Sequence, residues 1–273
     1  MKQLGLGLLN YESSRGSFPY NLGRELANTS GTTPYDLSNR GRSWIGQTLP
    51  FIENAELYNR MQFDQPLSNA ANLDACGTPI KSLLCPSDST RVGTMNNRSN
   101  IGNHPTSGKA WGITNYKAVA GGNWAWGDHT GVSMAGGRWP NDTNGLDRGN
   151  GVICRNNDNQ AGNITPLSSI RDGASKTFAI GESVPEFCTH STWFYFNHNT
   201  ATCGVPLNYQ VGLLDLTTVS SDWGRNYSFF SRHPGGGMFT LCDGSTTFVT
   251  DSIDLTLYRQ LATIAGRESV SVP

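Results

Sequence analysis

The apolar residues near the start of the chain follow a helical period. Leu4, Leu8 and Tyr11 stand at i, i+4 and i+7, so they share one helix face. The pattern predicts a short helix over residues 2–14 that ends at Arg15-Gly16. No capping residue precedes this helix, so we expect a further segment upstream of it; the alternative is an N-terminal helix that frays.

Four further apolar patterns predict elements in the middle of the chain. Residues 44–61 carry apolar positions at helical spacing, interrupted by Pro50, and predict helical turns. Short apolar runs bounded by turn residues predict buried strands. These runs are residues 80–85, 113–120 and 177–180.

The end of the chain reads as a hairpin followed by a helix. Residues 238–249 are two β-prone segments around Asp243-Gly244, a pair suited to a two-residue turn, and this register makes Phe239 the partner of Phe248. Leu257, Leu261 and Ile264 then recur at helical spacing. They predict a helix over residues 255–265, with Ser252 or Asp254 as N-cap and Gly266 at its C-terminal end.

Composition favours a loop-rich α+β protein. Only 15% of the 273 residues are charged, and 32 are glycine. Residues 121–163 and 187–230 are irregular, rich in Gly, Asn and aromatic residues, and predict long insertions in a single domain over residues 1–273. A net charge of −1 without a basic stripe argues against nucleic acid or an anionic membrane surface as a partner.

The six cysteines suggest an oxidising compartment. The close pairs Cys76/Cys85 and Cys188/Cys203 are candidate disulfides, although the connectivity stays open and buried free thiols are the alternative. No C-x-x-C is present, which argues against a zinc knuckle or a thioredoxin-type site.

Four segments of the chain stand out together. They are residues 2–19, Leu84-Cys85-Pro86-Ser87-Asp88, residues 170–182, and His233 to Gly244 with the tail Leu261 to Gly266. In their order and spacing these segments resemble the planctomycete-type prepilin-like proteins with a C-terminal H-x9-DG domain. His233 and Asp243-Gly244 stand at the spacing that gives this domain its name.

The resemblance implies a fold and a function. The expected fold is an α+β pilin-like head, with an N-terminal helix packed on an antiparallel sheet, long insertions, and a C-terminal hairpin plus helix. The expected function is a structural subunit of a type IV pilus-like or type II secretion pseudopilus-like filament. Its partners would be like subunits and the assembly machinery. The leader and membrane helix typical of such proteins are not in this sequence.

The same resemblance implies an extracellular or cell-surface location, with anchoring in the inner membrane through that helix before assembly. The alternative function is a surface module that binds a glycan or another solute on the same scaffold. Trp124, Trp126 and Trp139 are its candidate ligand-binding residues, since aromatic rings can stack on sugars, although such rings more often fill cores.

His233 and Asp243 invite a catalytic or metal reading, but geometry opposes it. Ten residues of extended strand span roughly 33 Å, so the two side chains cannot share a site on a straight strand. We expect Asp243-Gly244 to form the turn and His233 to be a hydrogen-bonded anchor. Glu182 follows a predicted strand and is expected to cap a neighbouring backbone or to pair with Arg232 or His233 rather than to act as a general acid or base.

Asp142, Asn144 and Asp147 resemble part of a calcium loop, with oxygen-bearing side chains around Gly145. The family resemblance adds support because major pseudopilins often bind calcium. The alternative is an ordinary Asx-rich turn, since the bidentate Glu of a calcium loop is missing.

No catalytic residues are predicted. The sequence lacks G-x-S-x-G, H-E-x-x-H and G-x-x-x-x-G-K-[ST] motifs, so we expect the protein not to be an enzyme. A deep pocket containing two convergent carboxylates, or a histidine paired with a nucleophile, would favour a hydrolase instead.

Overall fold

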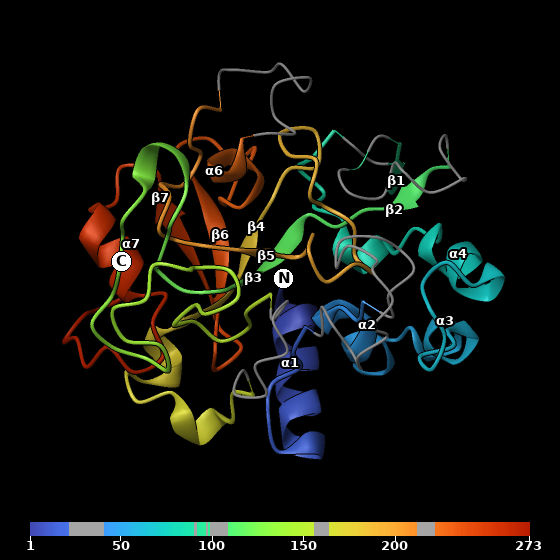
Figure 1. Cartoon of the computed structure of the whole chain (residues 1–273), viewed down its shortest axis with the longest axis horizontal. Helices are drawn as coiled ribbons and strands as arrows, with labels where there is room; N and C mark the ends of the chain where they lie inside the picture. The colour runs from blue at the N-terminus through green and yellow to red at the C-terminus, as the bar shows by residue number, and fades with distance from the viewer. Residues whose placement is uncertain (22–40, 90–91, 97, 99–108, 156–163, 212–221) are drawn as a thin grey trace.

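The fold is α+β and is built around one mostly antiparallel sheet with helices on both sides (Figure 1). The strands run in the order β5-β3-β4-β6-β7, and only the β3–β5 pair is parallel. The computed structural model describes residues 1–21, 41–89, 92–96, 98, 109–155, 164–211 and 222–273. The strands of this sheet are β3 (Tyr116–Val119), β4 (Phe178–Glu182), β5 (Thr200–Ala201), β6 (Gly236–Leu241) and β7 (Thr246–Thr250).

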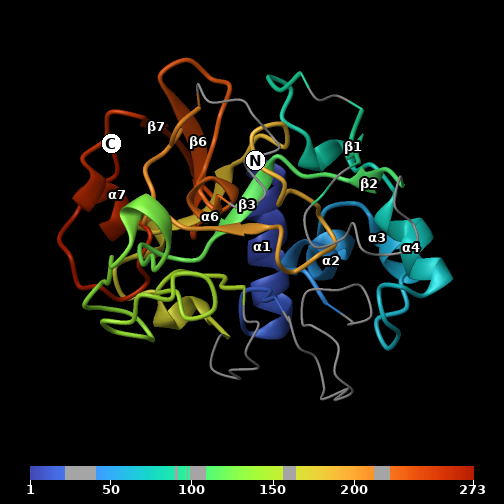
Figure 2. The ribbon, with the colours of Figure 1, turned by 45° about the horizontal axis from the view of Figure 1, so that its top comes forward.

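The sheet separates two apolar clusters because successive side chains of a strand point to opposite faces. Ala118 packs with Leu8 of helix α1 (Lys2–Arg15) in one cluster. Val119 and Phe239 pack with Tyr258 of helix α7 (Leu255–Gln260) in the other. Figures 1 and 2 both place α1 and α2 on one side of the sheet and α7 on the other.

Helix α1 confirms the predicted N-terminal helix. It ends at Gly16, whose φ of 76° is the left-handed conformation expected of a glycine cap. Near its start the helix lies so close to the hairpin that a Cβ on Gly5 would stand 2.7 Å from Thr240 and 3.2 Å from Gly244 Cα. Glycine therefore allows α1 to approach the tip of the hairpin.

The helical turns predicted over residues 44–61 are present, whereas the strand predicted over residues 80–85 is wrong. Ile80 and Leu83 are both buried, a spacing of three rather than two, and the Leu83 amide donates to the Ile80 carbonyl at 3.0 Å. The segment therefore turns instead of extending. The helical elements here are α2 (Trp44–Thr48), η1 (Leu49–Phe51), α3 (Ala55–Arg60), α4 (Ala70–Cys76) and η2 (Lys81–Leu83).

The other two predicted strands correspond to β3 and β4. The described residues also form a second sheet, which has two strands. It consists of β1 (Thr94–Met95) and β2 (Trp111–Gly112), and the remaining short helices are η3 (Gly127–His129), η4 (Leu167–Ser169), η5 (Ala174–Lys176) and α6 (Trp223–Asn226).

The C-terminal hairpin forms with a register that differs by one residue from the prediction. Phe239 pairs with Thr247, and Met238 pairs with Phe248. This register buries Val249 completely and leaves Phe248 40% exposed. The predicted register would instead turn Phe248 toward the core and Val249 toward solvent. The loop has three residues and ends at Gly244, whose φ of 82° matches a type I turn followed by a left-handed glycine.

Helix α7 begins as predicted and ends early. The Asp254 carboxylate accepts from the Leu257 amide at 2.9 Å, so Asp254 is the N-cap. The helix stops at Gln260 because the following backbone bonds to other segments. The Ile264 amide donates to the Asn150 carbonyl at 3.0 Å, and the Gly266 amide donates to the Asp172 carboxylate at 2.6 Å.

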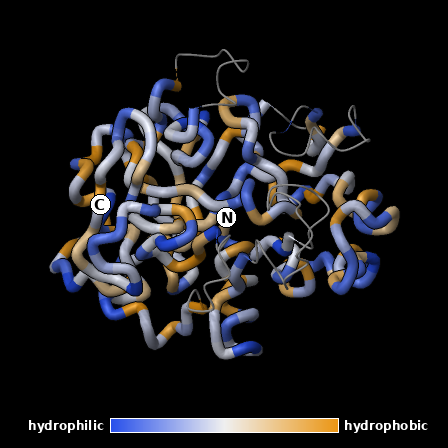
Figure 3. Tube along the Cα trace, in the orientation of Figure 1, coloured by the Kyte–Doolittle hydropathy of each residue, from blue (hydrophilic) through white to orange (hydrophobic). Residues whose placement is uncertain are grey.

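The two predicted insertions are largely irregular where they are described. Residues 156–163 of the first and 212–221 of the second lie outside the described residues, and the single domain over residues 1–273 stays a prediction. Within the described ranges, no helix has the length and apolar character needed to span a membrane. Along the trace in Figure 3, apolar and polar stretches alternate at short intervals.

Candidate functional site

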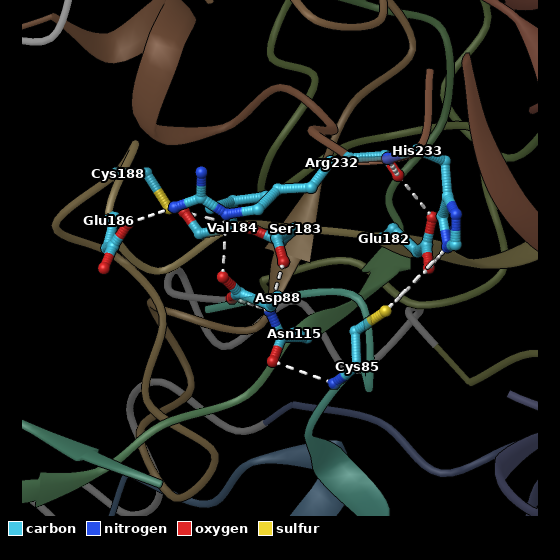
Figure 4. A network of polar contacts seen from close by, with 11 residues as sticks. Cys85, Asp88, Asn115, Glu182, Ser183, Val184, Glu186, Cys188, Arg232 and His233 are labelled. Atoms are coloured by element: carbon cyan, nitrogen blue, oxygen red, sulfur yellow. Dashed lines mark hydrogen bonds and ion pairs between the residues drawn. The ribbon is translucent and has the colours of Figure 1, made fainter. Parts of the chain in front are cut away.

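Three of the four segments that carry the family resemblance meet at one group of polar side chains (Figure 4). We call Cys85, Glu182 and His233 the thiol cluster. The Cys85 Sγ lies 3.4 Å from Glu182 Oε1 and 4.0 Å from His233 Nε2. The His233 Nε2 lies 3.4 Å from the same Glu182 Oε1. A sulfur, an oxygen and a nitrogen atom from three side chains therefore lie close together.

Glu182 is held by one of its two carboxylate oxygens. Its Oε2 accepts hydrogen bonds from the Ser231 hydroxyl and from the Met238 amide, each at 2.8 Å. The side chain is only 5% exposed. Because Oε2 is occupied by the protein, Oε1 is the oxygen turned toward Cys85 and His233.

Backbone contacts fix the two other members of the thiol cluster. The Cys85 amide donates to Asn115 Oδ1 at 3.0 Å, and the His233 amide donates to Ser231 Oγ at 3.1 Å. The His233 side chain is 32% exposed, so solvent reaches the cluster from that side. Both contacts that were expected of Glu182, with a backbone amide and with His233, are present in the structure.

A second polar group lies next to the thiol cluster and holds its segments together. Arg232 donates through Nε to Asp88 Oδ1 at 2.9 Å and also pairs with Glu186. Asn115 donates through Nδ2 to Asp88 Oδ2 at 2.5 Å and to the Ser183 carbonyl at 2.9 Å. These contacts tie the residue before His233 to the residue after Glu182.

Burial controls the protonation of the thiol. Burial, with a contribution from the neighbouring Glu182 carboxylate, raises the pKa of Cys85 above its ordinary value. Burial also raises the pKa of Tyr116, whose hydroxyl bonds to Cys85. Cys85 is therefore a thiol at neutral pH and a weak nucleophile.

The thiol and histidine do not form a catalytic triad. In such a triad the nucleophile and the carboxylate bind opposite ring nitrogens, so that the carboxylate can orient the base. Here both Cys85 Sγ and Glu182 Oε1 face Nε2 of His233. The three side-chain atoms therefore meet at one point and do not form a linear proton relay.

His233 and Asp243, the two ends of the sequence motif, have separate partners. Asp243 accepts through Oδ1 from the Ser245 amide at 2.9 Å and from the Ser245 hydroxyl at 2.6 Å. Together with Gly244 it forms the hairpin loop beside helix α1. The motif thus spans strand β6, with its histidine at one end and its turn at the other.

The predicted calcium residues use their oxygens within the chain; we call residues 142–147 the acidic loop. Asp142 accepts from the Asn144 amide at 2.8 Å and pairs with Arg148. Asn144 Oδ1 accepts from the Asp147 amide at 3.0 Å. The Asp147 carboxylate forms two bonds with Arg155, at 2.8 and 2.5 Å. These are the contacts of Asx turns and ion pairs, and a calcium ion would have to displace both arginines.

The three candidate tryptophans do not form an open stacking surface. Trp124 is completely buried in a core cluster with Tyr227, so its ring has no exposed face. Trp126 is half-buried and packs edge-on against Trp124 with ring centres 5.0 Å apart. Trp139 is half-buried and has the Arg148 guanidinium 5.8 Å from its ring centre.

The disulfide prediction differs from the structure, in which Cys76, Cys85, Cys188 and Cys203 are all free. Each of these sulfur atoms has different neighbours. Cys188 lies 3.6 Å from the Lys117 ammonium group, while Cys76 and Cys203 are buried in different apolar clusters. Cys85 belongs to the thiol cluster, so neither predicted pair is joined.

One protein-family model matches residues 1–256, almost the whole chain. Its description reads "Protein of unknown function (DUF1559)". The chain belongs to the DUF1559 family. This agrees with the resemblance to planctomycete-type proteins at the level of the family. No curated protein and no solved structure matches the chain.

Sequence reasoning found Glu182 and His233 but missed Cys85, Asp88 and Ser231 as their partners. A signal was available, since Cys85 and Asp88 belong to the Leu84–Asp88 motif and Ser231 stands two residues before His233. The motifs contained these residues, but the sequence did not show that their side chains lie close together in the fold.

Proposed function

We propose that this DUF1559 protein is the head domain of a pilin-like subunit that assembles into a filament outside the inner membrane. The observation that carries the proposal is the position of helix α1, whose buried face packs on a largely antiparallel sheet. In a pilin-like subunit this helix joins the head to the filament core, while the head supplies the outer surface.

The outer face of α1 supports a role in subunit contacts. Leu6 is 57% exposed on this helix, while Leu4 and Leu8 are buried against the sheet. An apolar side chain on an otherwise polar exposed helix face is suited to burial against a second subunit. The contact would be small in a single pair and would be repeated along a filament.

The alternative of a glycan-binding module has less support. Its candidate residues were the three tryptophans, of which Trp124 is buried in the core and the other two are half-buried against neighbouring side chains. The filament subunit is therefore the preferred function, and no catalytic activity is part of the proposal.

The test is assembly of the complete gene product on cells. We expect chemical cross-linking to yield a ladder of multimers, and sheared surface material to contain filaments by electron microscopy. Leu6→Glu should reduce the multimers about tenfold, which corresponds to about 1.4 kcal/mol per contact.

The matched control is Val92→Glu, which places the same charge at a 73% exposed apolar residue outside α1. It should assemble like the wild type. A wild-type protein that reaches the surface and stays monomeric under cross-linking would contradict the proposal, as would equal losses in both variants.

A further inference from the structure

We propose that Cys85, Glu182 and His233 form a zinc-binding site with three protein ligands and a fourth position open to solvent. The site goes beyond the filament role and does not depend on it. The sulfur, carboxylate oxygen and ring nitrogen all lie within 4.8 Å of one another, and they form the one such group among the described Cys, His, Asp and Glu side chains.

The spacing of the three atoms matches the edges of a zinc coordination tetrahedron. Zinc binds sulfur at about 2.3 Å and nitrogen or oxygen at about 2.0–2.1 Å, so in a tetrahedral site nitrogen and oxygen stand roughly 3.3–3.4 Å apart, and sulfur stands roughly 3.5–3.6 Å from either of them. The observed separations are 3.4 Å for sulfur to oxygen, 3.4 Å for nitrogen to oxygen and 4.0 Å for sulfur to nitrogen. Only a small movement of His233 would complete the geometry.

The donor set selects the class of metal. Thiolate and imidazole suit zinc and other borderline transition metals, whereas calcium and magnesium prefer oxygen ligands alone. One sulfur, one nitrogen and one oxygen therefore point to Zn²⁺. Binding would replace the proton of the Cys85 thiol by the metal, with that proton released to water.

The surroundings are those of supported metal ligands. Glu182 Oε2 is held by Ser231 and by the Met238 amide, which leaves Oε1 free to coordinate. Ser231 also accepts from the His233 amide, so one hydroxyl positions two of the three ligands. Such supporting contacts orient ligands and raise metal affinity.

The site would also join distant parts of the chain. Cys85 is 97 residues from Glu182 and 148 residues from His233 in sequence. A zinc ion would cross-link the segment after η2, the end of β4 and the segment before β6. Since His233 is 32% exposed, a water molecule or an external donor can reach the fourth position.

The experiment measures zinc binding to the reduced, chelator-treated chain by competition with a chromophoric chelator. We expect one zinc ion per chain and an increase in the thermal unfolding midpoint. Cobalt should give the absorption band of a thiolate–cobalt bond. Cys85→Ser and His233→Ala should each weaken zinc binding by at least about 100-fold, and Ser231→Ala by about tenfold.

Two controls separate the site from general metal adhesion. His129→Ala removes a half-buried histidine outside the cluster, and Asp74→Asn removes an exposed carboxylate that pairs with Arg60; both should bind zinc like the wild type. Alkylation of Cys85, followed by mass spectrometry, should be slowed by zinc in the wild type but not in His233→Ala.

His233→Ala is the decisive variant because the side chain is partly exposed and its loss leaves the buried contacts of Glu182 intact. Circular dichroism should show it folded without metal. A reduced wild-type chain that binds no zinc would overturn the proposal. So would a folded His233→Ala chain that binds zinc with unchanged affinity.

Discussion

The thiol cluster and the acidic loop both contain residues that commonly bind metals, yet the structure uses them differently. In the acidic loop, Asp142 and Asp147 are paired with arginines, and Asn144 binds backbone amides. In the thiol cluster, Glu182 has one oxygen held by the protein and the other turned toward Cys85 and His233. The first set of ligands is internally satisfied, and the second converges on an accessible point.

The difference shows that residue type and spacing in sequence are insufficient to define a metal site. Oxygen atoms that already accept bonds from amides and guanidinium groups have to lose those bonds before an ion can bind. A convergent set whose supporting bonds use other atoms loses little on binding. The exposure of the partner side chains also differs: Arg155, beside the 7% exposed Asp147, is only 5% exposed, whereas His233, beside Glu182, is 32% exposed.

The largest effect should come from separating the buried pair of the acidic loop. Arg155→Met removes the guanidinium that pairs with the buried Asp147 carboxylate, so we expect the free energy of unfolding to fall by about 3–5 kcal/mol. Arg148→Met, which affects the more exposed pair with Asp142, should cost less than about 1 kcal/mol.

Urea unfolding followed by tryptophan fluorescence measures both values. Equal losses in the two variants would contradict the view that Asp147 is committed to a buried ion pair. A small loss in Arg155→Met would reopen the acidic loop as a place where an external cation could replace the arginine.

The next effect is a loss of stability in acid, and it arises at His190 in the interior of the protein. Burial lowers the pKa of His190 to about 3, and the charges of Lys117 and Arg155 act in the same direction. An unfolded histidine binds a proton below about pH 6.5. Between these values the unfolded chain therefore carries one more proton at this residue, so stability falls as the pH is lowered, by at most about 1.4 kcal/mol per pH unit.

Replacing this ring should reduce the acid sensitivity. His190→Asn should flatten the dependence of the free energy of unfolding on pH between about pH 6 and pH 4, measured by urea titrations at each pH. His129→Asn, at a half-buried histidine, serves as the comparison and should change the slope less. A variant at position 190 with the wild-type slope would place the acid sensitivity elsewhere.

The smallest effect should be that of calcium on the acidic loop. Because Arg148 and Arg155 occupy the carboxylates, we expect about 1 mM calcium to raise the free energy of unfolding by less than about 0.1 kcal/mol. Calorimetric titration and thermal unfolding measure this directly. A stabilisation that grows with calcium and disappears in Asp142→Asn would instead establish the loop as a calcium site.

Local signals predicted much of the secondary structure. The period of Leu4, Leu8 and Tyr11 gave helix α1, and Asp254 gave the cap of α7. The errors arose where distant contacts decided the outcome. The hairpin register follows from burying Val249 in the core under α7, and the end of α7 follows from backbone bonds made by the residues after it.

The candidate site was predictable only in part, for a related reason. The motifs contained Cys85, Glu182 and His233, and the local pattern suggested that Glu182 could pair with His233. Cys85 was assigned to a disulfide because Cys76 is close in sequence, whereas the fold places its sulfur beside the two other side chains. Proximity in sequence was a poor guide to proximity in space.

The sequence by itself determined the α+β class, the N-terminal helix, the position of the turn at Asp243-Gly244 and the membership of a family. These depend on local periodicity, turn chemistry and motif spacing, which neighbouring residues carry. Only the tertiary structure decided which polar residues became a site. In the folded chain, Arg148 and Arg155 pair with the two aspartates of the acidic loop, and Cys85 and His233 lie beside Glu182. Such contacts depend on how the whole chain packs.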